Sequence, residues 1–336
     1  MADGRGRVAT SKLLDADAAL ARLRDPGALD RLSALGGESP LLVDLRGEDP
    51  AAWTGAGLLG TLPCPSVAWV DAGGEAPGFD VVVESETALH EVTQKIRRNP
   101  LASLALVQLL RLNEARSLHE GLVAESLVYA TLQAGPEFYD WLSAKRPPKP
   151  RPDAEGPAVR IERDGETLHL TLDRPAKRNA FSAEMRDGLC EGLTVALADE
   201  SIAHVELRGE GPCFCSGGDL DEFGTLPDPA TAHAIRSTRN PGRLLVACAD
   251  RVRATVQGAC VGAGIELPAF AAHVTARADA TFRLPEVSMG LVPGAGGTAS
   301  LPRRIGRQRT AWMALSGAVV DAKRAAAWGL VDEVIE

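Results

Sequence analysis

A proline-rich segment from Lys145 to Pro157 divides the 336-residue chain into two parts. The segment reads KRPPKPRPDAEGP and contains five prolines with no apolar periodicity. Because proline fixes the backbone and lacks the N–H that a helix or central strand needs, such a stretch is typical of a stiff, exposed linker. We therefore expect one folded part before about residue 150 and another from about residue 158. Two domains are also what this chain length favours.

The composition indicates ordinary globular domains. Hydrophobic residues make up 45% and charged residues 24%, which is the balance of a soluble chain with a sizeable core. The 36 basic and 45 acidic residues give a net charge of −9, which argues against nucleic acid as the main partner. No apolar run reaches the roughly 18 residues of a membrane helix, and the N-terminus lacks the apolar stretch of a signal peptide. We expect a soluble, cytoplasmic protein with neither nucleic acid nor membrane as partner.

The cysteines and histidines indicate neither a disulfide scaffold nor a metal site. The six cysteines contain no C-x-x-C pair, and the histidines show no H-x-x-x-H spacing. Free thiols in a reducing compartment are the simplest interpretation. We therefore expect no metal and no redox cofactor.

The part before the linker shows two kinds of pattern. Residues 84–144 are predicted to be mainly helical, because apolar residues recur at spacings of three and four and neither glycine nor proline interrupts 101–120. Residues 1–83 predict a helix around 12–34 and then two short buried strands, LLVDL at 41–45 and SVAWV at 66–70.

After the linker, strand-like runs alternate with helical ones. VRIERDG and TLHLTL, over 159–172, predict a two-stranded hairpin, and Ser182 is placed to cap a helix that ends near residue 198. Further helices are expected over 229–247, 262–271, 304–317 and 321–328. This alternation predicts the α/β class, with helices packed on a sheet.

Three glycine-rich segments lie in this second part, at Cys213–Asp219, Gly258–Glu266 and Gly290–Gly297. Glycine-rich turns let backbone N–H groups approach a ligand closely. None of the three fits G-x-G-x-x-G with a suitably placed acidic residue, and none fits G-x-x-x-x-G-K-[ST]. The segments therefore give little support to a dinucleotide site or a P-loop.

Taken together, these segments resemble the enoyl-CoA hydratase/isomerase (crotonase) superfamily over about residues 158–336. Five motifs in order carry the resemblance: LTLDRPAKRNAFS, CFCSGGDL, GACVGAGIEL, FRLPEVSMGLVPGAGGTASLPRRIG and LSGAVVDAKRAAAWGLVDEV. The resemblance implies a crotonase-like ββα spiral core and an acyl-CoA thioester substrate. It implies no cofactor, since CoA is part of the substrate.

The resemblance implies an oxyanion hole made of two backbone N–H groups. Gly218 matches the first donor position, and Ala263 matches the second, where the family usually has glycine. Only the N–H is needed there, so alanine is expected to serve. Two such donors stabilise the enolate that forms when a CoA thioester loses or gains a proton at its α-carbon.

The resemblance also implies two catalytic glutamates, Glu266 and Glu286. In the hydratases of the family such a pair holds one water, with one member acting as base and the other as acid, so their pKa values must differ. Members that only move a double bond, hydrolyse thioesters or decarboxylate commonly lack one of the two. The presence of both favours hydration.

Substrate contacts are expected from the loop before Asn179 and from the edge of the first glycine-rich segment. Lys177 and Arg178 are placed to reach the phosphates of CoA. The full predicted set is Lys177, Arg178, Ala180, Phe181, Ser216 and Gly217. Later in the chain, a solvated basic face is expected from Arg303, Arg304, Arg307 and Arg309.

The part before the linker has a resemblance of its own. Residues 98–150 resemble the C-terminal helical segment of the same family, which normally follows the GLVDEV strand; here they precede the core, as in a permuted gene or a duplicated and eroded one. Residues 41–74 faintly resemble the core strands without a glutamate matching Glu266. The expected organisation is an eroded, crotonase-like α/β segment at 1–83, a helical cap at 84–150 and a catalytic core at 151–336.

The sequence thus predicts an enoyl-CoA hydratase, a lyase that adds water to a 2-enoyl-CoA. Two alternatives stay open: another reaction of the superfamily, such as isomerisation or thioester hydrolysis, and a non-catalytic acyl-CoA-binding or assembly subunit. Hydration requires both carboxylates to converge on one water about 3 Å from each. Carboxylates that point apart, or a pocket filled by the N-terminal half, favour the binding subunit. A homo-oligomer, trimer or hexamer, is expected from the family.

Overall fold

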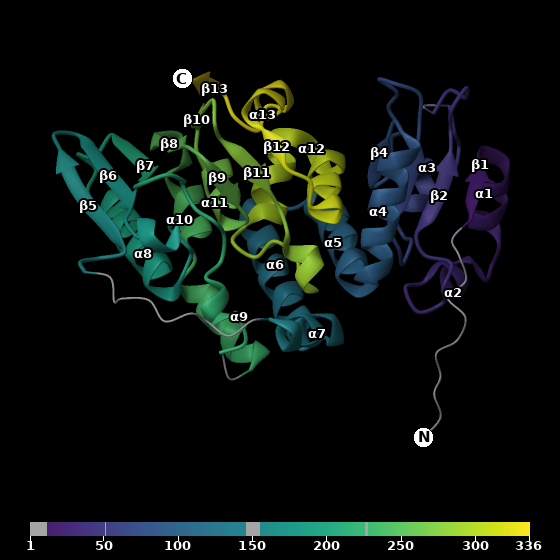
Figure 1. The fold of residues 1–336 in the computed structure, drawn as a ribbon, viewed down its shortest axis with the longest axis horizontal. Coiled ribbons are helices and arrows are strands. Elements are labelled where there is room, and N and C mark those ends of the chain that lie inside the picture. The colour runs from purple at the N-terminus through teal and green to yellow at the C-terminus, as the bar shows by residue number, and fades with distance from the viewer. Residues whose placement is uncertain (1–11, 51, 146–154, 226–227) are drawn as a thin grey trace.

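The computed structural model describes residues 12–50, 52–145, 155–225 and 228–336, which form three regions (Figure 1). The N-terminal region is a four-stranded sheet in the order β1-β2-β3-β4, with every neighbouring pair parallel. Its strands are β1 (Leu13–Asp15), β2 (Leu41–Asp44), β3 (Ser66–Trp69) and β4 (Val81–Val83), and its helices are α1 (Ala16–Arg24), α2 (Ala28–Leu32) and α3 (Ala56–Leu59).

This N-terminal sheet is buried on both faces because successive side chains of a strand point to opposite sides. Leu41 and Val43 of β2 belong to an apolar cluster confined to the N-terminal region, together with Phe79. Leu42, between them in the sequence, belongs instead to the large apolar cluster of the rest of the molecule, together with Val67. One face of the sheet therefore covers a small core of its own, and the other face packs against the rest of the molecule.

Four helices follow as the second region, here called the helical region. They are α4 (Glu86–Arg98), α5 (Pro100–Asn113), α6 (Leu118–Gln133) and α7 (Pro136–Ala144). Ser85 and Ser117 cap α4 and α6 through their hydroxyls, and proline occupies the first turn of α5 and of α7. The buried side chains of these helices share one continuous cluster with the C-terminal region.

The C-terminal region contains a six-stranded sheet in the order β13-β10-β8-β7-β6-β5, in which only the β5·β6 pair is antiparallel. Its strands are β5 (Val159–Asp164), β6 (Thr167–Leu172), β7 (His204–Gly209), β8 (Val252–Val256), β10 (His273–Arg277) and β13 (Glu333–Ile335). A three-stranded sheet, in the order β12-β11-β9, lies beside it and consists of β9 (Ala259–Val261), β11 (Thr281–Arg283) and β12 (Val320–Asp321).

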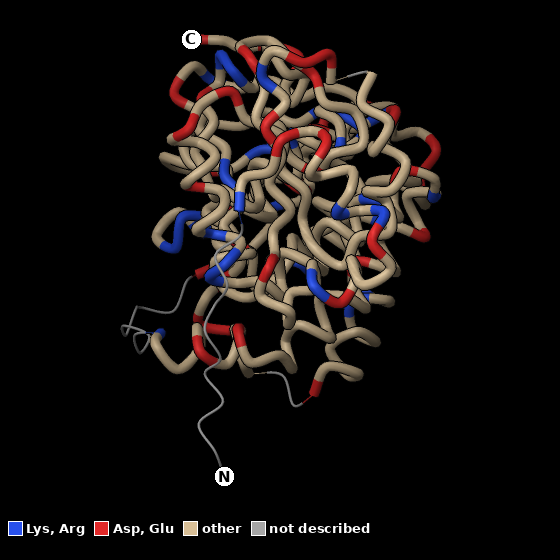
Figure 2. The backbone as a smooth tube through the Cα atoms, turned by 90° about the vertical axis from the view of Figure 1, so that its right-hand side faces the viewer, with Lys and Arg blue, Asp and Glu red and all other residues tan. Residues whose placement is uncertain are grey.

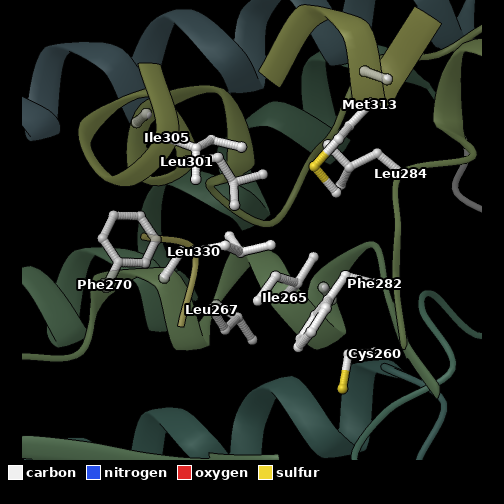
Figure 3. Close-up of a cluster of buried hydrophobic side chains, with 14 of the residues drawn as sticks. Cys260, Ile265, Leu267, Phe270, Phe282, Leu284, Leu301, Ile305, Met313 and Leu330 are labelled. Carbon is white, nitrogen blue, oxygen red and sulfur yellow. The ribbon is translucent and has the colours of Figure 1, made fainter. Parts of the chain in front are cut away.

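The helices of this region are α8 (Ala183–Ala198), α9 (Pro229–Thr238), α10 (Pro241–Ala247), α11 (Ala263–Glu266), α12 (Gly297–Ser316) and α13 (Ala322–Trp328). The short helix α11 is packed into the core: Ile265 lies in a buried cluster with Leu301 and Ile305 of α12 (Figure 3). Helix α12 is interrupted at Gly306, whose φ of 79° is not helical. It links the C-terminal core to both of the other regions through the contacts described below.

The predicted α/β class and the 159–172 hairpin are confirmed. Some predicted helices are shorter or divided, because proline breaks them: 229–247 forms α9 and α10, separated at Asn240–Pro241, and 262–271 ends its α-helical part before Pro268. The strands β1 and β4 were not predicted. Residues 146–154 of the predicted linker lie outside the described residues.

The predicted solvated basic face is wrong for two of its four arginines. The side chains of Arg304 and Arg307 are only 12% and 10% exposed. Arg304 donates to the carbonyl oxygens of Ala269 and Ala271, while Arg307 pairs with the fully buried Asp80 of the N-terminal region. These two guanidiniums are internal links rather than surface charges.

Charges elsewhere are mixed along the chain. Basic and acidic residues are interspersed over the backbone in Figure 2, in keeping with the modest net charge. Within the described ranges, no helix has the length and hydropathy needed to span a membrane.

Candidate active site

A cavity of about 200 Å³ lies between the helical region and the C-terminal core. Helices α6 and α9 contribute to its wall together with α11, the loop after β7 and the start of α8. Five residues singled out from the sequence line it: Phe181, Gly218, Ala263, Glu266 and Glu286. Residues up to 105 positions apart in the chain are thus brought to one space.

Two backbone N–H groups of the cavity wall have no acceptor among the described residues. Phe181 donates its N–H to the Gly217 carbonyl at 2.7 Å, and Asp219 donates to the Phe181 carbonyl at 3.0 Å, which leaves the Gly218 N–H between them without an acceptor in the described chain. Ala263 is the first residue of α11, where a helix offers no acceptor to its N–H groups. No other described group accepts from it. Both N–H groups are available to an oxygen atom of a ligand.

Position 262 requires glycine, because a side chain there would collide with a carboxyl group. The same distances show where the carboxyl groups of Glu266 and Glu286 lie. Gly262 has a φ of 52°, and a Cβ there would stand 2.4 Å from Oε1 of Glu286. The same point lies 3.6 Å from Oε1 of Glu266. The two carboxyl groups therefore converge on one place beside the start of α11.

Glu266 is buried, at 2% exposure, between Ile265 and Leu267. Its Oε2 accepts hydrogen bonds from the N–H groups of Ala295 and Gly297, at 2.8 and 2.9 Å. Loss of hydration raises the pKa of Glu266 to about 7, while the two N–H bonds act in the opposite direction by favouring the charged form. The result is a carboxyl group that can exchange its proton near neutral pH.

Glu286 has a different environment. It begins the 3-10 turn Glu286–Met289 after β11, and its buried Oε2 has no hydrogen-bond partner among the described residues. Burial, and then the charge of Glu266, raise the pKa of Glu286 well above its ordinary value. With no donor on Oε2 to favour the anion, the neutral acid is the preferred form.

A third carboxylate, Glu125 of α6, stands behind Glu266 and was not predicted from the sequence. It is 2% exposed, its Oε1 accepts from the Gly296 N–H at 2.6 Å, and its Oε2 accepts from the N–H and hydroxyl of Thr298 at 2.8 and 2.6 Å. The four successive N–H groups of residues 295–298 thus alternate between Glu266 and Glu125. Burial and the charge of Glu266 raise the pKa of Glu125 to about 8.

Tyr129 and Arg236 are the other site residues that the sequence reasoning missed. Tyr129 lies one helical turn after Glu125 and packs its ring against Gly294, where an added Cβ would come within 2.5 Å of it. The Arg236 guanidinium lies 4.8 Å from the centre of that ring. A signal for Glu125 was present: it stands on an apolar helix face four residues before Tyr129, and a carboxylate in such a place needs a partner.

The residues predicted to contact CoA lie mostly outside the cavity lining. The Lys177 ammonium pairs with the Asp219 carboxylate at 2.9 Å, and Arg178 is exposed with a φ of 54°. Ala180, Ser216 and Gly217 are not among the lining residues, whereas Phe181 is. Contacts of these residues with CoA stay predictions.

The thiols and carboxylates of the described residues form no metal-binding group of three or more. The six cysteines are all free and buried. Burial raises the pKa of Cys215 to about 12, so its thiol stays protonated. The cavity lining itself provides two carboxyl groups for acid–base chemistry beside a pair of N–H donors.

Comparisons with known proteins place this geometry in context. A family model described as "Enoyl-CoA hydratase/isomerase" matches residues 162–336. A 2,3-dehydroadipyl-CoA hydratase from Escherichia coli (strain K12) is 36% identical over 174 residues, which cover 52% of this chain and 68% of that protein. A 1,2-epoxyphenylacetyl-CoA isomerase from the same strain is 35% identical over 173 residues, covering 50% of this chain and 66% of that protein.

A solved structure gives the same result for the fold. The crystal structure of an enoyl-CoA hydratase from Thermoplasma volcanium GSS1 is similar with a TM-score of 0.50 and 35% sequence identity, covering 54% of this chain and 73% of that one. The crotonase-like core predicted from the sequence is thus confirmed. This chain spans about two thirds of the length of the curated relatives described.

Proposed function

This chain belongs to the enoyl-CoA hydratase/isomerase family, and from that premise we propose that it adds water to the double bond of a 2-enoyl-CoA thioester. The relatives named above include both a hydratase and an isomerase, so membership alone leaves the reaction open. The observation that carries the proposal is the convergence of Glu266 and Glu286 on one point of a cavity that the N–H groups of Gly218 and Ala263, without an acceptor among the described residues, also line.

In the proposed complex, the thioester carbonyl accepts hydrogen bonds from the N–H groups of Gly218 and Ala263. These donors polarise the carbonyl and lower the energy of the enolate that forms when a nucleophile adds to the β-carbon. Each donor aimed at the developing oxyanion contributes roughly 3 kcal/mol. Because both donors belong to the backbone, the alanine at position 263 supplies the same group as glycine.

The two glutamates divide the proton transfers. The Glu266 carboxylate removes a proton from water as the water oxygen bonds to the β-carbon, and the electron pair of the double bond moves into the enolate. The enolate then takes a proton at its α-carbon from the neutral Glu286, so the product has gained one water. The N–H bonds on Glu266 favour an anion, and the partnerless Oε2 of Glu286 favours an acid, which supports this division.

The alternatives make different demands on the same cavity. Isomerisation moves one proton between two carbons and adds no water, so one carboxylate suffices. A non-catalytic acyl-CoA-binding subunit needs neither carboxylate. The two converging carboxyl groups differ in their hydrogen bonds, because Glu266 accepts two backbone N–H groups and Oε2 of Glu286 has no partner among the described residues. Such a pair, next to a cavity that the helical region lines without filling, supports hydration over both alternatives.

The experiment replaces each glutamate by its neutral isostere. We expect Glu266→Gln and Glu286→Gln to lower kcat for hydration of a short 2-enoyl-CoA by at least about 100-fold, because general acid–base catalysis contributes roughly 100- to 10,000-fold. The loss of absorbance of the conjugated thioester follows the reaction, and calorimetry with a saturated acyl-CoA follows binding, which we expect to be retained.

Glu191→Gln is the matched control, because Glu191 is an exposed residue of α8 outside the cavity. It should hydrate the substrate at the wild-type rate. Hydration at an unchanged rate in either cavity variant would contradict the mechanism. Loss in only one variant, with double-bond migration retained, would favour the isomerase.

A further inference from the structure

Arg236 is a cation that the mechanism above does not use. It belongs to α9 and lines the same cavity as Glu266 and Glu286. Its guanidinium lies over the ring of Tyr129 at 4.8 Å, and the Tyr129 ring in turn abuts Gly294, next to the loop that holds Glu266. The charge is thus placed on the wall beside the acid–base pair.

The hydrogen bonds of Arg236 all go to neutral groups. Its Nε and Nη2 donate to the hydroxyl and carbonyl of Ser126, at 3.1 and 3.3 Å, and its Nη1 donates to the Gln133 amide oxygen at a long 3.4 Å. Throughout the described ranges, no carboxylate lies within 4.0 Å of it. Burial lowers the pKa of Arg236, which reflects the hydration that its cation has lost.

Three arginines of this protein that are more deeply buried each pair with a carboxylate. Arg111 pairs with Asp80 at 2.5 Å, Arg307 pairs with Asp80 at 2.8 Å, and Arg174 pairs with Glu184 at 2.6 Å. A buried cation is normally balanced by an anion with which it shares hydrogen bonds. Arg236 is part-buried, has no such ion pair among the described residues, and lines a cavity.

We propose that Arg236 binds a carboxylate at the far end of the acyl group, so that the substrate is the CoA thioester of a dicarboxylic acid; this rests on the proposed function. The paired loop of Phe181 and Gly218 sets the position of the thioester, and the glutamates set the position of the double bond. Tyr129 and Arg236 line the same cavity as these groups, and the proposal places the far end of the acyl chain against them. The planar fork of a guanidinium matches a carboxylate with two parallel hydrogen bonds.

The test measures binding of saturated thioesters by calorimetry, which needs no catalysis. Succinyl-, glutaryl- and adipyl-CoA are compared with butyryl-, pentanoyl- and hexanoyl-CoA, so each pair has equal chain length and differs in the terminal carboxylate. We expect at least one carboxylate-terminated ligand to bind 10- to 100-fold more tightly than its partner, as one charge-assisted pair provides. We expect Arg236→Gln to abolish that difference while leaving the uncharged partner unaffected.

Two controls separate the sources of a negative charge. Free CoA carries the phosphates without an acyl group, and its affinity should be the same for wild type and Arg236→Gln. Arg243→Gln, at an exposed position of α10 outside the cavity, should behave as wild type throughout. Equal affinities in all three wild-type pairs, or an equal loss of free-CoA affinity in Arg236→Gln, would overturn the proposal.

The affinities of the wild-type protein for the three ligand pairs test the carboxylate preference even where Arg236→Gln fails to fold. A carboxylate preference without hydration would sink the proposed reaction and leave this inference standing. Hydration of a short 2-enoyl-CoA without any carboxylate preference would do the reverse.

Discussion

The two regions that precede the C-terminal core both pack on helix α12, yet they differ in what they contribute to the site. The helical region reaches the beginning of α12, where Glu125 accepts the N–H groups of Gly296 and Thr298 and Tyr129 lines the cavity. The N-terminal sheet region reaches the second half of α12, where Asp80 pairs with Arg307. The interruption at Gly306 separates the two contacts.

Their cores differ in the same way. The buried residues of the helical region belong to one cluster with the C-terminal core, whereas the N-terminal region also has a cluster of its own. No residue before 129 lines the cavity in the part of the chain that the structure describes. The comparison indicates that the helical region is part of the site and that the N-terminal region is a docked unit.

The largest expected effect tests the docked unit. Asp80 is fully buried and accepts hydrogen bonds from Arg111, Arg307 and Ser66. Replacing it by alanine leaves the Arg111 guanidinium buried without a carboxylate, so we expect Asp80→Ala to lower the free energy of unfolding by about 3 kcal/mol. Urea titration measures this loss, and Asp30→Ala, at an exposed position of α2, serves as its control.

The same variant should keep its catalysis. At a temperature where Asp80→Ala is folded, we expect its kcat/KM to equal that of wild type, because the docked unit contributes nothing to the cavity. A 100-fold fall in kcat/KM of the folded variant would break the distinction between the two regions.

The next effect tests the helical region. In Glu125→Gln the amide oxygen can still accept one of the hydrogen bonds from the loop at 295–298, but the amide NH₂ faces another N–H donor and cannot accept. The loop therefore loses hydrogen bonds to α6, and we expect Glu266, which the same loop holds, to be displaced. A misplacement of about 1 Å at a catalytic group costs roughly 100-fold, so we expect kcat to fall by about that factor with little change in KM. Steady-state kinetics on a 2-enoyl-CoA measure both.

Glu120→Gln on the same helix is the control for Glu125→Gln. Glu120 accepts from the Ser117 N–H at 2.9 Å in the capping box of α6, so its loss costs at most about 1 kcal/mol of stability. Its kcat should stay at the wild-type value. A wild-type kcat in Glu125→Gln would mean that the helical region only packs against the site.

The smallest effect compares a carboxyl group of the docked N-terminal region, Asp80, with one of the C-terminal core, Glu286. Asp80 has cationic partners, whereas Oε2 of Glu286 has none among the described residues. Because the folded state raises the pKa of Glu286, the folded protein holds that proton more tightly, and its stability falls as the pH rises above 4.5. We expect Glu286→Gln to be more stable than wild type by at least about 1 kcal/mol at pH 8.

The pH dependence supplies the check on Glu286→Gln. The stability difference should shrink as the pH falls towards 4.5, where the unfolded carboxyl is also protonated. Thermal unfolding of wild type, Glu286→Gln and Glu191→Gln at pH 5 and pH 8 measures it. A difference that is equal at both pH values would show that the charge of Glu286 is not responsible.

The sequence was sufficient for the parts of the site that lie in short motifs. Gly218, Ala263 and Glu266 occur within two glycine-rich segments whose resemblance to the family's motifs identifies them, and the structure brings them to one cavity with Glu286. The reaction, the CoA contacts and the oligomeric state stay predictions.

What the sequence did not predict depends on contacts between distant segments. Glu125 finds its partners more than 170 positions later, in a loop whose path only the fold defines. Arg307 was expected in solvent because a helical arginine usually is, and the buried Asp80 that reverses this lies 227 positions earlier. The strands β1 and β4 are three residues long, which is too short for periodicity to distinguish them.

The measurement that tests the central claim most directly is isotope incorporation during turnover. Crotonyl-CoA is incubated with the wild-type protein in H₂¹⁸O and, separately, in D₂O, and the products are analysed by mass spectrometry. We predict a 3-hydroxyacyl-CoA that carries ¹⁸O on its β-carbon and deuterium on its α-carbon, with Glu266→Gln and Glu286→Gln forming neither. Crotonate with ¹⁸O in its carboxylate, or a shifted double bond without ¹⁸O, would contradict hydration by this pair of glutamates.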